Sequence, residues 1–198
     1  MPDRDLNLQQ LLDLSQRIIS QRGDIFAVAA GKRVFSRLAA REGSRGGTKA
    51  ERLPVCTHTL DAALAGLAAD ASPLPDLAAA FAAVEAGLAW VRRRGTKAGD
   101  EPFFNGHANA MLVGPGGIEE RDDIWVGVTV LAPHVTYPDH DHPPEEVYIA
   151  LSPGEWWNAG MDWTEPGPGG VIYNPRGILH AMRAGAKPLL ALWFLPID

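Results

Sequence analysis

Hydrophobic residues in the first half of the chain recur at the spacing of an α-helix. In the first segment they are Leu8, Leu11, Leu12, Ile18 and Ile19, and they fall on one helical face. Similar spacing continues through residues 25–40, 60–67 and 77–91. The pattern therefore predicts a helical N-terminal segment, with the basic triplet 92–94 at the end of its last helix.

From about residue 103 the pattern changes to short β-type runs separated by glycine and proline. These runs are residues 110–113, 124–131, 147–151, 171–173 and 189–195. We therefore expect a mainly β fold, with a small β-barrel in residues 103–198 and a helical segment, residues 1–102, packed on it as one compact unit. The alanine-rich stretch 77–89 suits either core packing or the contact of a homodimer.

Charge is divided unevenly between the two halves. Residues 1–100 hold fourteen Lys and Arg against eleven Asp and Glu, whereas residues 101–198 hold four against thirteen. An acidic surface repels nucleic acid, so the sequence indicates no nucleic-acid partner.

The N-terminus resembles neither a secretion signal nor a membrane anchor. It carries Asp3, Arg4 and Asp5 where a signal would have a basic start and an apolar core, and no apolar run approaches the roughly eighteen residues of a membrane span. Cys56 is the only cysteine, which excludes an internal disulfide. We expect a cytoplasmic protein without a membrane partner.

The candidate chemistry lies in the acidic half. His140, His142 and Glu146 form an H-x-H-x-x-x-E run, and His180 follows in Pro-Arg-Gly-Ile-Leu-His. Imidazole and carboxylate are ligands for a borderline divalent cation. Because side chains alternate along a strand, we expect His140 and His142 on one face, with prolines 143–144 turning the chain into a new strand that begins at Glu146. The four residues predict one metal site.

These two motifs resemble those of the cupin superfamily, whose small antiparallel, jelly-roll-like β-barrel carries a metal. The second motif is matched by Gly169, Pro175, Gly177 and His180, although Ala184 stands where the family has asparagine. In the first motif, Pro153 replaces a glycine. The resemblance implies a cupin β-barrel with His140, His142, Glu146 and His180 as metal ligands.

Two tyrosines flank the predicted ligands. Tyr148 lies two residues after Glu146, so strand alternation places it on the same face, and Tyr137 precedes His140 by three residues. A phenol has a pKa near 10, and lowering it by about three units requires roughly 4 kcal/mol, which a neighbouring cation can supply. Tyr148 is therefore a candidate general base at neutral pH, with Tyr137 as a second residue of the same cavity.

The block from Tyr137 to Tyr148, followed by the His180 motif, is similar to that of the cupin-type dimethylsulfoniopropionate lyases of marine bacteria. That resemblance implies a carbon–sulfur lyase that converts dimethylsulfoniopropionate to dimethyl sulfide and acrylate by β-elimination. The partner is then a small sulfonium carboxylate, the cofactor is a divalent metal ion such as Fe(II), Zn or Mn, and Tyr148 is the proposed base. Aromatic faces can meet the sulfonium; the candidates are Trp125, Trp156, Trp157, Trp163, Trp193 and Phe194.

Two alternatives remain open from the sequence. One is another cupin enzyme, an Fe-dependent dioxygenase or a lyase acting on a different small carboxylate. The other is a metal-dependent protein that binds a small ligand without turnover. Oxygen consumption would reveal the first alternative, and saturable binding without product would reveal the second.

Overall fold

The computed structural model describes residues 4–47, 49–68 and 73–198. Its helices are α1 (Leu6–Arg22), α2 (Ile25–Ala40), α3 (Pro54–Ala68), α4 (Leu74–Glu85) and the short α5 (Phe103–Gly106). Among the described helices, none combines the length and the apolar character needed to cross a membrane.

The first two helices begin where a carboxylate caps them. Asp5 accepts hydrogen bonds from the backbone N–H groups of Asn7 and Leu8, and Asp24 caps α2 in the same way. Each cap satisfies N–H groups that have no partner inside the helix. The predicted helix 25–40 is confirmed, and the first predicted segment is a helix over its full length.

The last predicted helix, residues 77–91, is wrong at its C-terminal end. Helix α4 stops at Glu85, and Trp90 and Val91 form β2, which pairs with β3. Turn hydrogen bonds from Gly87 to Val84 and from Leu88 to Glu85 end the helix, and the Trp90 indole then donates to the Glu85 carboxylate. The basic triplet 92–94 therefore follows a strand.

Most strands belong to one eight-stranded sheet in the order β1-β4-β3-β5-β12-β7-β10, with β2 pairing to β3. Their bounds are β1 Ser44–Arg45, β2 Trp90–Val91, β3 His107–Val113, β4 Glu119–Glu120, β5 Ile124–Leu131, β7 Glu146–Ala150, β10 Val171–Asn174 and β12 Leu189–Pro196. All five predicted strands lie in this sheet. Since β1 and β2 come from the helical segment, the predicted boundary between residues 102 and 103 separates the segments in sequence but does not separate the sheet.

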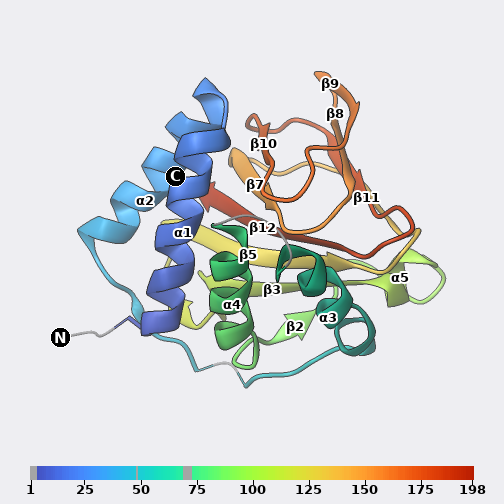
Figure 1. Ribbon diagram of the computed structural model, residues 1–198, viewed down its shortest axis with the longest axis horizontal. Coiled ribbons are helices and arrows are strands. Elements are labelled where there is room, and N and C mark those ends of the chain that lie inside the picture. The colour runs from blue at the N-terminus through green and yellow to red at the C-terminus, as the bar shows by residue number, and fades with distance from the viewer. Residues whose placement is uncertain (1–3, 48, 69–72) are drawn as a thin grey trace.

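A second sheet of four strands follows the order β6-β11-β8-β9, made of Thr136–His140, His180–Arg183, Glu155–Asn158 and Met161–Thr164. The described strands thus form two sheets, and the predicted small barrel is not one barrel closed by hydrogen bonds. In Figure 1, β8, β9 and β11 lie at the opposite end of the molecule from α2.

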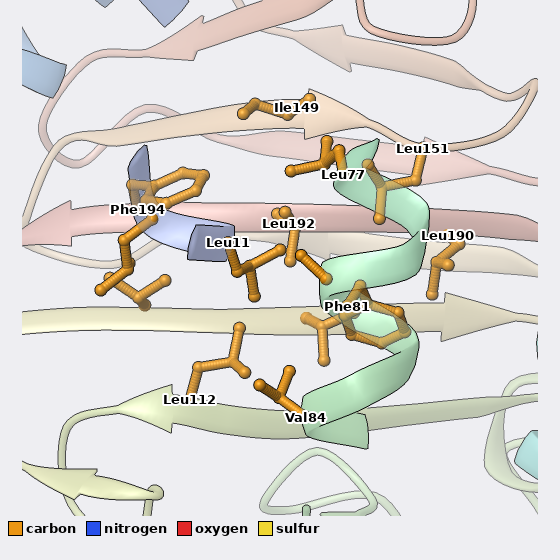
Figure 2. Close-up of a cluster of buried hydrophobic side chains, with 14 of the residues drawn as sticks. Leu11, Leu77, Phe81, Val84, Leu112, Ile149, Leu151, Leu190, Leu192 and Phe194 are labelled. Atoms are coloured by element: carbon orange, nitrogen blue, oxygen red, sulfur yellow. The ribbon is translucent and has the colours of Figure 1, made fainter. Parts of the chain in front are cut away.

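The large sheet has a different neighbour on each face. Leu190, Leu192 and Phe194 of β12 belong to one buried cluster with residues of the helices, whereas Leu189 and Ala191 belong to a second cluster with residues of the small sheet. Figure 2 shows Leu77, Phe81 and Val84 of α4, with Leu11 of α1, against the side chains of β3, β7 and β12. Because side chains alternate along a strand, β12 is apolar on both faces.

Candidate metal centre and active-site cleft

Three of the predicted ligands come together at one end of the large sheet. The ligand atoms of His142, Glu146 and His180 all lie within 4.8 Å of one another. The Nε2 atoms of His142 and His180 are each 3.3 Å from Oε2 of Glu146. Glu146 begins β7, as predicted, and His180 begins β11, so the group joins the two sheets.

Each histidine near this group is oriented through its Nδ1 atom. Nδ1 lies 2.9 Å from a backbone carbonyl oxygen in all three: Pro138 for His140, Pro144 for His142 and Ile178 for His180. A carbonyl can only accept, so Nδ1 carries the proton and the lone pair lies on Nε2. Metal-binding histidines are commonly oriented in this way, by a hydrogen bond from the ring nitrogen that does not contact the metal.

The group fits a divalent metal ion. Nε2 of His180 is buried and has no hydrogen-bond partner among the described residues, although it faces the Glu146 carboxylate. A buried nitrogen without a partner is costly, and a bound cation would satisfy it. Two neutral imidazoles and a carboxylate make a ligand set for a borderline divalent cation.

The charges of the group favour an ionised carboxylate. Burial works against the charged form of Glu146, but its close contacts with His142 and His180 outweigh it and hold the pKa of Glu146 at about 2. Burial also opposes the charge of His142, yet its contact with Glu146 leaves the pKa of His142 raised. Glu146 therefore stays negative at neutral pH and suits a cation.

His140 lies beside this group and outside its 4.8 Å limit. It pairs with His180 in the strand register at the end of β6, and the two ring centroids are 4.0 Å apart. His142 lies past the end of that strand, so strand alternation does not relate the two rings, whose centroids are 6.2 Å apart. Burial lowers the pKa of His140 to about 4, which keeps its imidazole neutral.

A cleft of about 230 Å³ opens beside the candidate ligands. The side chains that line it are Arg93, Asn109, Trp125, Thr129, Tyr137, His140, Asp141, His142, Glu146, Tyr148, Met182, Trp193 and Leu195. Both predicted tyrosines therefore face the same space as the ligands.

The two tyrosines are buried in this cleft, with 5% and 3% of Tyr137 and Tyr148 exposed. Burial raises the pKa of Tyr137 to about 12. Burial raises the pKa of Tyr148 well above its ordinary value, and the neighbouring Glu146 carboxylate adds to this effect. Both phenols are protonated at neutral pH unless positive charge enters the cleft.

Among the aromatic candidates, Trp125 and Trp193 line the cleft. Trp156 is buried in the core between the sheets, and Phe194 faces the helices. Trp157 and Trp163 lie on the β8–β9 hairpin with ring centroids 6.5 Å apart.

Four polar residues of the cleft were not singled out by the sequence: Arg93, Asn109, Thr129 and Asp141. Arg93 was taken for the end of a helix, yet its guanidinium lies 5.8 Å from the centroid of the Tyr137 ring. Asn109 and Thr129 are cross-strand partners on β3 and β5. Asn109 and Thr129 are polar residues within otherwise largely apolar strands, and this was the signal by which the sequence could have indicated them.

Comparison with known proteins gives one consistent family. A family model described as dimethylsulfoniopropionate lyase matches residues 28–191. The dimethylsulfoniopropionate lyase DddQ of Ruegeria pomeroyi is 32% identical over 115 residues, which is 57% of this chain and 57% of that protein. The alignment therefore spans little more than half of that relative.

Solved structures agree over nearly the whole chain. The crystal structure of DddQ from Ruegeria pomeroyi superposes with a TM-score of 0.72 at 26% identity, covering 98% of this chain and 93% of that one. A chain described under the lyases RdDddP and RnDddQII gives a TM-score of 0.70 at 22% identity, with 96% and 92% covered. This second likeness concerns the fold.

Proposed function

The chain belongs to the dimethylsulfoniopropionate lyase family, and we propose that it is a metal-dependent lyase that cleaves dimethylsulfoniopropionate to dimethyl sulfide and acrylate. The observation that carries the proposal is the cleft in which a fitting metal-ligand group and two buried tyrosines meet. Within a member of this family, such a cleft suits β-elimination from a small carboxylate.

His142, Glu146 and His180 would hold the metal ion, and we propose His140, whose neutral ring lies against that of His180, as a further ligand. Fe(II), Zn and Mn all accept these donors. When bound, the ion supplies a Lewis acid that stabilises negative charge developing on the substrate carboxylate.

Tyr148 is the proposed base. It lies two residues after Glu146 on β7 and faces the cleft. Its phenolate would take the proton on the carbon next to the carboxylate, the electron pair of that C–H bond would form the double bond of acrylate, and the C–S bond would break. Because the sulfonium leaves as neutral dimethyl sulfide, no general acid is needed. Burial raises the pKa of Tyr148, so its phenolate depends on positive charge brought into the cleft.

The walls of the cleft suit both ends of a zwitterion. Arg93 offers a guanidinium to a carboxylate. Trp125 and Trp193 offer aromatic faces to a sulfonium. We propose that the substrate carboxylate lies toward Arg93 and the metal ligands.

The test is the release of dimethyl sulfide, measured in the headspace by gas chromatography from protein loaded separately with Fe(II), Mn or Zn. His142→Ala serves as the blank. We expect metal-dependent release from the wild-type protein well above the blank. Release no faster than the blank, from folded protein with bound metal, would mean that the substrate is another molecule.

A further inference from the structure

A chain of three hydrogen bonds crosses the wall of the cleft and ends on Tyr137. The Trp193 indole N–H donates to Oγ1 of Thr129 at 3.1 Å. The Thr129 hydroxyl donates to Oδ1 of Asn109 at 2.6 Å, and Nδ2 of Asn109 donates to the Tyr137 hydroxyl at 3.2 Å. All four side chains line the cleft that holds the candidate metal ligands.

The direction of this chain follows from its first member. An indole N–H can only donate, so Thr129 must accept there and is left with its own proton to give. Asn109 accepts that proton through Oδ1, which turns its amide nitrogen toward Tyr137. The reverse orientation of the amide would leave the Thr129 proton without its acceptor.

The large sheet is built to hold this arrangement. Thr129 pairs with Asn109 across β5 and β3, so the two side chains share one face. Trp193 of β12 pairs with Gly127 of β5, and a Cβ at Gly127 would lie 2.2 Å from the indole ring. The absence of a side chain at residue 127 therefore gives the indole the space in which its N–H reaches Thr129.

The Tyr137 hydroxyl can still donate one hydrogen bond to a ligand. Its oxygen accepts from Asn109, and its own proton has no acceptor among the described residues. We propose that Tyr137 donates this proton in a hydrogen bond to the substrate carboxylate, and that Asn109 and Thr129 are positioning residues that aim it. Negative charge grows on that carboxylate during proton abstraction, so a donor fixed in advance stabilises the transition state. The role of base is then left to Tyr148.

This inference rests on the proposed lyase function, and a double-mutant cycle tests it. We expect Thr129→Val, which removes only the hydroxyl, to lower kcat about tenfold with KM changed less than twofold, and Thr129→Ser to restore it. In a Tyr137→Phe background, Thr129→Val should cost nothing further. The exposed Thr164 on β9 provides the matched control, Thr164→Val. Losses that multiply in the double variant would overturn the proposal.

A second measurement needs no turnover. The chain has three tyrosines, so ¹³Cζ-tyrosine labelling gives a small set of resonances that Tyr→Phe variants assign. We expect Thr129→Val to move the Tyr137 resonance and to leave that of Tyr173 in place. An unmoved Tyr137 resonance in folded protein would overturn the hydrogen-bond chain, whereas wild-type protein without dimethyl sulfide release would overturn only the lyase function.

Discussion

At the scale of single residues, the site depends on histidines held by backbone carbonyls and on tyrosines whose pKa burial raises. His142 and His180 keep Nε2 facing Glu146 because Nδ1 is held by a backbone carbonyl. The sequence could predict these ligands, because the two motifs contain them. It could not predict that Tyr137 accepts a hydrogen bond from Asn109, which lies 28 residues away in the chain. This hydrogen bond distinguishes Tyr137 from Tyr148.

Arg93 gives a direct test of where the carboxylate binds. Arg93→Ala should raise KM for dimethylsulfoniopropionate by about tenfold with a smaller effect on kcat, because it removes a charge-assisted hydrogen bond from the bound state. Arg93→Lys should recover part of the loss. The exposed neighbour Arg94 supplies the control, since Arg94→Ala removes the same charge outside the cleft. Equal effects of the two alanine variants would contradict a specific contact.

His107 makes stability depend on pH. It is fully buried, donates to the Phe103 carbonyl through Nδ1 and accepts from the Arg93 backbone N–H through Nε2, and burial lowers its pKa. Below about pH 6.5 the unfolded chain binds a proton that the folded chain resists, so the free energy of unfolding falls as pH falls. Above that pH its contribution is constant.

The measurement is the melting temperature of metal-free protein at pH 7.5 and pH 5.5. We expect the wild-type protein to lose stability between these values and His107→Gln to lose less. A variant whose melting temperature falls as far as that of the wild type would contradict this account.

At the scale of elements, the sequence predicted the strands that alternate or run apolar, such as residues 124–131. Of the small sheet it predicted only a strand at His140. Strands β6, β9 and β11 carry polar residues at positions such as Thr136, Asp162 and Arg183, so their hydrophobic pattern is weak. They form because hydrogen bonds to neighbouring strands satisfy their backbones. The pairing of β6 with β11 joins residues far apart in the sequence, and such pairing leaves little local signal.

Gly127 of β5 leaves the space that the Trp193 ring of β12 occupies. Gly127→Ala places a methyl group against the Trp193 ring, and we expect a loss of about 1–3 kcal/mol in the free energy of unfolding, measured by urea denaturation. Gly66→Ala on α3, where a Cβ meets nothing within 4 Å, should instead be neutral or stabilise by about 0.5–1 kcal/mol. A Gly127→Ala protein as stable as the wild type would mean that the indole moves without cost.

At the scale of the whole molecule, the large sheet separates the helix-packed core from the cleft with the candidate ligands. Its helix-facing side is closed by α1 and α4, as Figure 2 shows, and its other side forms the wall of the cleft. The sequence of β12 does not show which face of the sheet meets the helices and which meets the cleft. The strand is apolar on both faces because it lies between two packed layers. The hydrophobic pattern of the sequence nevertheless predicted the order along the chain, with helices in the first half and most strands in the second.

The most direct test of the account measures metal content and dimethyl sulfide release together in three proteins. Wild type should bind metal and turn over. Tyr148→Phe should retain the metal, because His142, Glu146 and His180 remain to hold it, and lose at least about a hundredfold in kcat, within the range for a general base. His180→Ala should lose both metal and turnover. A Tyr148→Phe protein that binds metal and keeps full activity would contradict the account, because the proton would then be taken by another group.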